Sequence, residues 1–309
     1  MAENIKTMAE RVGVEISAAS INAVVLGEDG GIAKSHSVVL TADSPMVEQL
    51  VALVDTLKKE IGGINRIGLA VPGLIDRASG RVAFSTNMPE NASVDLINEI
   101  KYTTSLDVVI ENDANAAAYG EFLLGAGRGV RNMFYATLGD GVGGAFIFNS
   151  EMWRGAAGYA GEFGHVTINS EGMKLEEVAS AANIIRRTRA RFHQDSTSSL
   201  NNLPEESITL AAIIAAAESD DDFAQMMLER TGSYVGAAIA SVINLLNIEK
   251  IVVGGAIMQA KGVVLNAIIE RARELAFAPA FEATSIVEGE LGLNAAAAGA
   301  ACLSGEVSD

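Results

Sequence analysis

Three polar residues, Glu111, Asn112 and Asp113, follow the apolar run of residues 108–110 and precede an alanine-rich segment. The apolar run predicts a buried strand and the alanines predict a helix, so the polar residues lie at the junction. One interpretation is structural: Asn112 or Asp113 caps the helix by accepting a hydrogen bond from an unpaired backbone N–H group. The other is that the carboxylate of Asp113 is held at a rigid junction to do chemistry.

A glycine-rich turn, LGDGVGG, spans residues 138–144 directly after another apolar strand. Glycines allow a ligand to approach the backbone closely, and exposed N–H groups in such a turn can bind phosphate. An ordinary hairpin turn needs one or two glycines, whereas this turn has four. The segment is therefore a candidate phosphate loop, although a glycine-rich turn alone is a motif of low specificity.

An acid and an imidazole, Glu162 and His165, stand three residues apart in the segment GYAGEFGH. Glycines flank both residues, and a carboxylate beside an imidazole would suit hydrogen bonding to vicinal hydroxyl groups of a sugar. The alternative is an exposed turn with incidental polar residues. This pair alone does not indicate a metal site, because no cysteine and no other histidine stands nearby.

The elements that must position these residues occur twice in the same order. Each half of the chain predicts a strand hairpin, a helix or helices, and a buried strand that ends in glycine. In the first half these elements cover residues 11–40, 45–61 and 66–73. In the second half they cover residues 132–155, 175–192, 208–218, 222–246 and 249–257.

Such a repeat predicts two similar layered α/β lobes with a cleft between them, where ligands usually bind. We expect residues 1–118 to form the N-terminal lobe, with the C-terminal helix of residues 294–309 packing back on it. Residues 119–293 are expected to form the larger C-terminal lobe.

Composition narrows the classes of function. The formal net charge of −17 disfavours binding to nucleic acid, because most of this surface would repel a phosphate backbone. A single cysteine, Cys302, excludes an internal disulfide and a cysteine-rich zinc site. The first residues lack the apolar core of a signal peptide and no run is long enough to span a bilayer, so we expect a cytoplasmic protein without a membrane partner.

Five motifs, taken in order, closely resemble the ROK family of sugar kinases and sugar-responsive repressors: ENDANAAAYGE, LGDGVGG, RGAAGYAGEFGH, LEEVAS and INLLNIEKIVVGG. The resemblance runs from about Val12 to Ala301. It implies an actin-like ATPase (ribonuclease H-like) fold, in agreement with the repeat. It also implies an ATP- and magnesium-dependent kinase for a hexose or amino-hexose, glucokinase-like at the 6-hydroxyl, in a homodimer or higher homo-oligomer.

The resemblance also implies roles for individual residues. Asp113 matches the general base. The residues that match sugar-binding positions are Asn87, Asn112, Glu162, His165 and Glu176. The residues expected along the ATP phosphates or near magnesium are Glu15, Ser17, Gly139, Asp140, Gly141, Gly143 and Gly144. Gly254 and Gly255 match the glycines near the adenosine.

The first hairpin departs from the family pattern. Where kinases of the family usually have Asp-x-Gly-Gly-Thr-Lys, this chain has EISAAS, from Glu15 to Ser20. Losing both glycines restricts how closely the loop approaches a phosphate, although the hydroxyls of Ser17 and Ser20 are expected to compensate in part. Asp140 also adds a negative charge where threonine is usual. The alternative function is therefore a non-catalytic sugar-binding sensor with a degenerate first phosphate loop.

The segment after His165 departs as well. In the family a cysteine-rich segment follows this histidine and binds zinc, whereas here VTINSEGMKLEE contains no cysteine, so we expect no zinc. His165 is then expected to be oriented by a hydrogen bond from its second ring nitrogen. A DNA-binding repressor is not expected, because the charge is negative and the first strand begins near Arg11. The sugar-binding motif argues against a filament-forming actin relative.

Overall fold

The computed structural model describes residues 11–62, 64–76, 81–84, 95–260 and 262–305, and the chain forms two compact units. The first unit comprises the described residues of 1–129, 151–160 and 293–309, and the second comprises those of 130–150 and 161–292. The lobe boundaries expected from sequence stay a prediction. Asn87, expected to bind sugar, lies outside the described residues.

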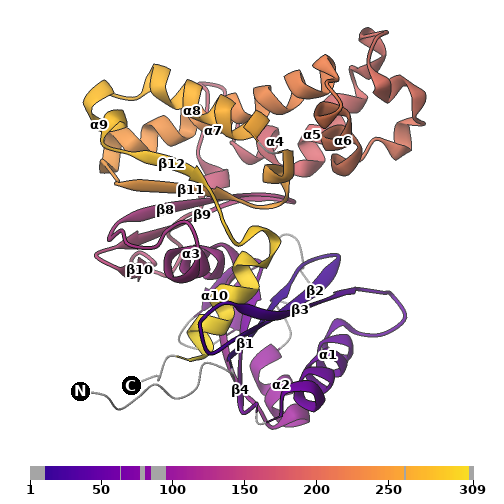
Figure 1. Ribbon diagram of the computed structural model, residues 1–309, viewed down its shortest axis with the longest axis vertical. Coiled ribbons are helices and arrows are strands. Elements are labelled where there is room, and N and C mark those ends of the chain that lie inside the picture. The colour runs from indigo at the N-terminus through magenta and orange to yellow at the C-terminus, as the bar shows by residue number, and fades with distance from the viewer. Residues whose placement is uncertain (1–10, 63, 77–80, 85–94, 261, 306–309) are drawn as a thin grey trace. The chain divides into compact units, whose positions relative to one another are not determined.

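The first unit is built on a sheet of five strands in the order β3-β2-β1-β4-β7 (Figure 1). Its strands are β1 (Arg11–Ile16), β2 (Ser20–Leu26), β3 (Ile32–Val39), β4 (Arg66–Val71) and β7 (Asp107–Asn112), with a separate ribbon of β5 (Leu74–Asp76) and β6 (Arg81–Phe84). Its helices are α1 (Met46–Ile61), α2 (Leu96–Thr104), α3 (Asp113–Leu124) and α10 (Ala295–Ser304).

Alternation along β1 separates two layers of this unit. Val12 and Val14 belong to an apolar core shared with α1 and α2. Gly13, which points to the other face, lies against the backbone of α10, and a Cβ atom there would collide with the carbonyl oxygen of Ala297. Small residues therefore allow the alanine-rich α10 to pack closely on the sheet.

The second unit repeats the arrangement with a sheet in the order β10-β9-β8-β11-β12. The strands of this sheet are β8 (Met133–Leu138), β9 (Val142–Phe148), β11 (Lys250–Gly254) and β12 (Ser285–Glu288), with β10 (Glu151–Trp153), from the segment 151–160 counted with the first unit, at one edge. The helices are α4 (Glu176–Ala179), α5 (Ala181–Arg189), α6 (Leu210–Glu218), α7 (Asp222–Leu246), α8 (Gly262–Leu275) and α9 (Ala278–Glu282). Short 3₁₀ turns are η3 (Phe163–His165), η4 (Phe192–Gln194), η5 (Ser199–Asn202), η6 (Glu205–Ser207), η7 (Ala256–Ala260) and η8 (Gly292–Asn294).

The two sheets share one topology, which confirms the duplication predicted from sequence. In the first, β1 pairs antiparallel with β2 and parallel with β4, which pairs parallel with β7. In the second, β8 pairs antiparallel with β9 and parallel with β11, which pairs parallel with β12. Each repeat thus begins with a hairpin and continues with two parallel strands.

The helix expected over residues 175–192 is a wrong prediction in one respect, because the structure divides it at Ser180. This residue has an extended backbone, with ψ at 156°, between α4 and α5. The N–H group of Ala181 donates to the carbonyl oxygen of Gly139 at 2.8 Å. A tertiary contact with the glycine-rich turn therefore takes the place of a helical hydrogen bond.

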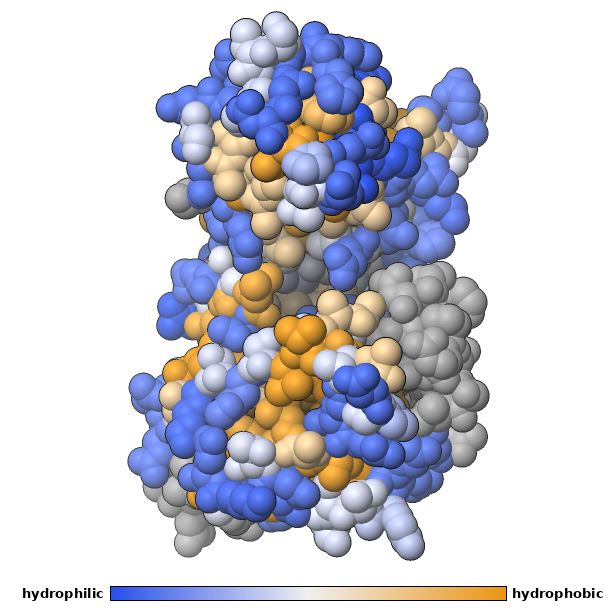
Figure 2. Space-filling model, turned by 90° about the vertical axis from the view of Figure 1, so that its right-hand side faces the viewer, coloured by the Kyte–Doolittle hydropathy of each residue, from blue (hydrophilic) through white to orange (hydrophobic). Residues whose placement is uncertain are grey.

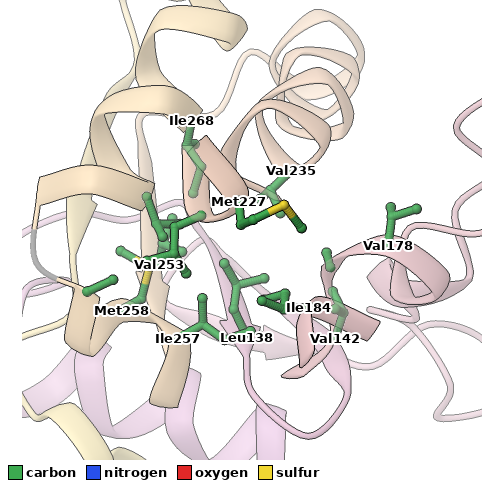
Figure 3. Close-up of a cluster of buried hydrophobic side chains, with 14 of the residues drawn as sticks. Leu138, Val142, Val178, Ile184, Met227, Val235, Val253, Ile257, Met258 and Ile268 are labelled. Carbon is green, nitrogen blue, oxygen red and sulfur yellow. The ribbon is translucent and has the colours of Figure 1, made fainter. Parts of the chain in front are cut away.

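The core of the second unit lies between its sheet and its helices (Figure 3). The structure confines the glycine-rich turn to residues 139–141, because Gly143 and Gly144 lie in β9. Leu138 and Val142, on either side of this turn, are both buried in the core. The labelled residues that surround them come from α4, α5, α7, α8, β11 and η7: Val178, Ile184, Met227, Val235, Ile268, Val253, Ile257 and Met258. Both ends of the turn are thereby anchored in packed apolar side chains.

The surface has a mixed character. Figure 2 shows hydrophilic residues spread widely over one face of the molecule, with apolar residues between them. This mixture is usual for globular domains, whose surfaces are largely made of apolar atoms. No helix in the described part of the chain combines the length and the apolar composition required to cross a membrane.

Candidate functional site

The junction between β7 and α3 is fixed by Asn112, which caps the helix. Its side chain accepts a hydrogen bond from the N–H group of Asn115 at 3.1 Å. Its amide nitrogen donates to the carbonyl oxygen of Gly73 and to Oδ1 of Asp113, each at 3.0 Å. Of the two capping residues considered from sequence, the cap is Asn112, and Asp113 is the first residue of the helix.

The carboxylate of Asp113 is held in a defined position at this helix N-terminus. Besides the amide of Asn112, the N–H group of Ala114 donates to its Oδ1 at 2.9 Å. The positive end of the helix dipole also favours a negative charge here. The geometry therefore fixes this carboxylate on a rigid support.

A buried ion pair behind the junction involves two residues to which sequence reasoning assigned no role. Glu111 is 5% exposed, and its Oε2 accepts hydrogen bonds from Nε and Nη2 of Arg154 at 2.9 and 2.8 Å. Its Oε1 accepts from the N–H group of Asn112 and the side-chain amide of Asn115. Both residues belong to motifs already identified from sequence: Glu111 is the first residue of ENDANAAAYGE, and Arg154 is the first residue of RGAAGYAGEFGH.

Glu15, on β1, is electrostatically coupled to Asp113. Burial and the negative charge of Asp113 raise the pKa of Glu15 from 4.5 to about 7, and a hydrogen bond from the amide of Asn22 opposes the rise. Two neighbouring carboxylates with one raised pKa favour a bound cation, because a positive charge would stabilise both ionised groups.

The turn after Glu15 is stabilised by hydrogen bonds among its own residues. The hydroxyl oxygen of Ser17 accepts hydrogen bonds from the N–H groups of Ala19 and Ser20 at 3.3 and 3.0 Å. It also lies 3.0 Å from the carbonyl oxygen of Ser20 and 3.1 Å from its hydroxyl oxygen. The hydroxyls expected to compensate for the missing glycines are therefore engaged within the turn.

The glycine-rich turn between β8 and β9 is held by hydrogen bonds to residues outside it. The N–H group of Val142 donates to Oε2 of Glu176 at 2.9 Å, and the carbonyl oxygen of Gly139 accepts from Ala181. Within the described part of the chain, the N–H groups of Asp140 and Gly141 donate no hydrogen bond. The turn is thus held at its edges and presents backbone donors at its tip, as an anion-binding turn requires.

Other glycines expected near the nucleotide also serve packing. A Cβ atom at Gly144 would lie 2.9 Å from Phe134 and Phe163, and one at Gly254 would collide with the hydroxyl of Tyr135. Gly255 has φ at +97° and packs against the backbone of Leu138. These three glycines bring the segments around the glycine-rich turn close together.

Glu162 and His165 lie on either side of the buried Phe163, next to β9. Gly161 and Gly164 allow this approach, because Cβ atoms there would collide with the carbonyl oxygens of Gly144 and Val142. The side chains of Glu162 and His165 are exposed, and Nδ1 of His165 lies 3.1 Å from Nζ of Lys174. Their role in sugar binding stays a prediction, as does that of Glu176.

Comparison with known proteins relates these features to sugar kinases and repressors. The sequence model of the ROK family matches residues 11–306. The chain is 32% identical over 275 residues to a glucokinase of Halalkalibacterium halodurans, covering 83% of each protein. It is 27% identical over 296 residues to a xylose repressor of Bacillus spizizenii, covering 93% of this chain and 75% of the repressor.

The structure is similar to that of a ROK family glucokinase from Streptomyces griseus in complex with glucose and AMPPNP. The TM-score is 0.83 at 27% sequence identity, covering 95% of this chain and 98% of that one. A ROK hexokinase from Thermus thermophilus, with a TM-score of 0.75 at 24% identity, has the same fold. The α/β fold is therefore the actin-like ATPase fold predicted from sequence.

Proposed function

Because this chain belongs to the ROK family, we propose that it is an ATP-dependent sugar kinase. It transfers the γ-phosphate of ATP to a hexose or amino-hexose, at the 6-hydroxyl as in a glucokinase. The observation that carries the proposal is the placement of Asp113 at the N-terminus of α3, held by Asn112 and Ala114. The similarity to a glucokinase complexed with glucose and AMPPNP supports both substrates.

In the proposed reaction, Asp113 accepts the proton of the sugar hydroxyl while that oxygen attacks the γ-phosphorus. The bond from the γ-phosphorus to the bridging oxygen breaks, and ADP leaves with the electron pair. Phosphoryl transfer has a loose transition state, so a well-placed carboxylate of ordinary basicity is sufficient. Its fixed position contributes more than its base strength.

We assign sugar binding to Asn112, Glu162, His165 and Glu176, whose amide, carboxylate and imidazole groups can bond to hydroxyls. Asn87 belongs to the same proposal from sequence. For ATP, we assign the phosphates to Gly139, Asp140, Gly141 and Gly143, with Gly144, Gly254 and Gly255 shaping the surrounding backbone. Ser17, which the sequence placed along the ATP phosphates, is left out of this assignment, because its hydroxyl is engaged within its own turn.

Magnesium fits the chemistry of the first unit. Glu15 would hold it, and its raised pKa beside Asp113 is the observation that favours a cation there. Magnesium commonly uses one or two protein carboxylates together with substrate phosphates and water. When bound with ATP, the ion supplies neutralisation of phosphate charge.

A sugar-binding sensor without catalysis is the second candidate. The self-bonded turn from Ser17 to Ser20 favours it, because its N–H groups at Ala19 and Ser20 are directed to a side chain rather than to a phosphate. The similarity to a xylose repressor is in accord with this alternative.

A coupled ADP-release assay separates the two candidates. Purified protein with Mg-ATP is tested against glucose, mannose, fructose, N-acetylglucosamine and N-acetylmannosamine, and sugar binding is measured by calorimetry. A kinase gives turnover with a sugar, and Asp113→Asn lowers it by about 10²- to 10⁴-fold while the sugar still binds. Asp107→Asn, the same change at an exposed position of β7, is the matched control. Sugar binding without turnover contradicts the kinase and favours the sensor.

A further inference from the structure

A short hairpin follows His165 and returns the chain to it. The N–H group of Ile168 donates to the carbonyl oxygen of Met173 at 2.8 Å, and that of Leu175 donates to the carbonyl oxygen of Val166 at 2.9 Å. Thr167 pairs with Lys174 in an antiparallel bridge. This register places Lys174 one residue before the end of the hairpin, within reach of His165.

The turn of this hairpin has its own stabilising features. The side chain of Asn169 accepts a hydrogen bond from the N–H group of Met173 at 2.9 Å. Gly172 has φ at +84°, a conformation that glycine adopts readily. The position of Lys174 is therefore set by hairpin geometry rather than by its own side-chain contact.

The contact between the two side chains specifies where the proton of the imidazole lies. Nζ of Lys174 is 3.1 Å from Nδ1 of His165, and an ammonium group has only donors. Nδ1 must therefore provide the lone pair. In the neutral ring the proton is then on Nε2, which becomes a donor.

We propose that Lys174 is a positioning residue that holds the His165 ring with Nδ1 as acceptor and Nε2–H directed to a sugar hydroxyl oxygen. This role rests on the proposed function, because it assumes that His165 binds the sugar. The ring then donates to a hydroxyl while the carboxylate of Glu162 accepts from one, which together match the two hydrogen-bonding capacities of a sugar hydroxyl.

A purely structural role for the contact is a poor explanation. Both side chains are exposed, and exposed polar contacts contribute little to stability. Removing the ammonium group is therefore expected to leave the fold intact and to free the ring to rotate. The resulting loss is expected in sugar binding, shared by the ground state and the transition state.

The test uses Lys174→Met, which keeps an aliphatic side chain but removes the donor, and Lys174→Arg, which restores one. Glu171→Gln, at the turn of the same hairpin, is the control for a charge change. Nitrogen-15 correlation spectra report the ring nitrogens, and because the chain has only three histidines, His165→Gln identifies the signal. Calorimetry and steady-state kinetics measure sugar affinity, KM and kcat.

The expected result is an Nε2–H ring with a hydrogen-bonded Nδ1 in the unchanged protein. Lys174→Met shifts the Nδ1 signal toward that of an unbonded ring nitrogen and raises the sugar KM and Kd by about 2- to 10-fold, the usual effect of one freed side chain, with kcat nearly unchanged. Lys174→Arg recovers both values, and Glu171→Gln changes neither.

An Nδ1–H ring in the unchanged protein overturns the proposal, as does a Lys174→Met variant with an unchanged Nδ1 signal or unchanged sugar affinity. If the unchanged protein binds no sugar, the proposed function is wrong, and so is the proposal that Nε2–H of His165 donates to a sugar hydroxyl. The nitrogen signals still decide whether Lys174 holds His165, so the two failures are distinguishable.

Discussion

The hairpins that begin the two repeats have turns whose hydrogen bonding differs: the first turn is bonded within itself, and the second is bonded to residues outside it. In the first, the Ser17 hydroxyl accepts from backbone N–H groups that a phosphate would otherwise use. In the second, Glu176 and Ala181 hold the edges of the turn, and glycines leave its backbone accessible. The difference fits the proposal that the turn of the second repeat binds phosphate, while the first repeat contributes the carboxylates of Glu15 and Asp113 and a turn stabilised by its own polar groups.

The largest predicted effect tests whether the ion pair between Glu111 and Arg154 stabilises the fold. Arg154→Met leaves the buried carboxylate of Glu111 without its cationic partner, so we expect the free energy of unfolding to fall by about 3 kcal/mol. Denaturant unfolding measures the change. Adding Glu111→Gln is expected to recover part of the loss by removing the unpaired charge. If Arg154→Met alone were as stable as the unchanged protein, the ion pair would have no stabilising role.

The second prediction compares Gly139, in the turn of the second hairpin, with Gly144, in the strand β9 that follows the turn. At Gly139 a Cβ atom meets nothing closer than Ala256 at 4.0 Å, so Gly139→Ala is expected to preserve the fold and raise the KM for ATP by about 10- to 100-fold, because the methyl group blocks phosphate approach. Gly144→Ala is expected to lower Tm, because its methyl group collides with Phe134 and Phe163. The comparison between the turns fails if Gly139→Ala leaves ATP kinetics unchanged.

The third prediction concerns the pH dependence of stability. The raised pKa of Glu15 means that the folded protein binds more protons than the unfolded chain between pH 4.5 and about 7. The free energy of unfolding therefore falls as pH rises through this interval. Glu15→Gln is expected to remove about 1 to 2 kcal/mol of that fall and to be more stable than the unchanged protein at pH 8.

Denaturant unfolding at pH 4.5 and pH 8 measures this difference, with Glu28→Gln, at an exposed position between β2 and β3, as the control. Equal pH profiles for Glu15→Gln and the unchanged protein would show that burial and Asp113 do not raise the pKa of Glu15 in the folded protein.

The smallest predicted effect tests the first turn itself. Ser17→Ala removes the acceptor for two N–H groups and is expected to cost about 1 kcal/mol of stability. The KM for ATP is expected to change by less than about 2-fold. Exposed Ser35→Ala, on β3, is the control. A large loss of ATP affinity in Ser17→Ala alone would place the first turn at the phosphates and remove the contrast between the turns.

The sequence predicted the repeated hairpins and the parallel strands after them, because strand periodicity and glycine turns are local signals. It also predicted a polar cluster at the junction of β7 and α3, where Asn112 and Asp113 lie. Motif order predicted the family and therefore the actin-like fold. These features depend on neighbouring residues or on a pattern that extends along the whole chain.

Features that depend on distant contacts could not be predicted in the same way. The break at Ser180 follows from the bond between Ala181 and the glycine-rich turn, about 40 residues earlier in the chain. The pairing of Glu111 with Arg154 joins two segments 43 residues apart. A partner for the second nitrogen of His165 was expected, but only the register of the hairpin identifies Lys174.

The most direct test of the central claim is detection of the phosphorylated product. The protein is mixed with Mg-ATP and each sugar in turn, and phosphorus NMR identifies any hexose phosphate and the carbon that carries it. The account predicts a 6-phosphate that forms with the unchanged protein and with Asp107→Asn, and that is lost in Asp113→Asn. A product formed equally fast by Asp113→Asn, or no phosphorylated sugar at all, would contradict it.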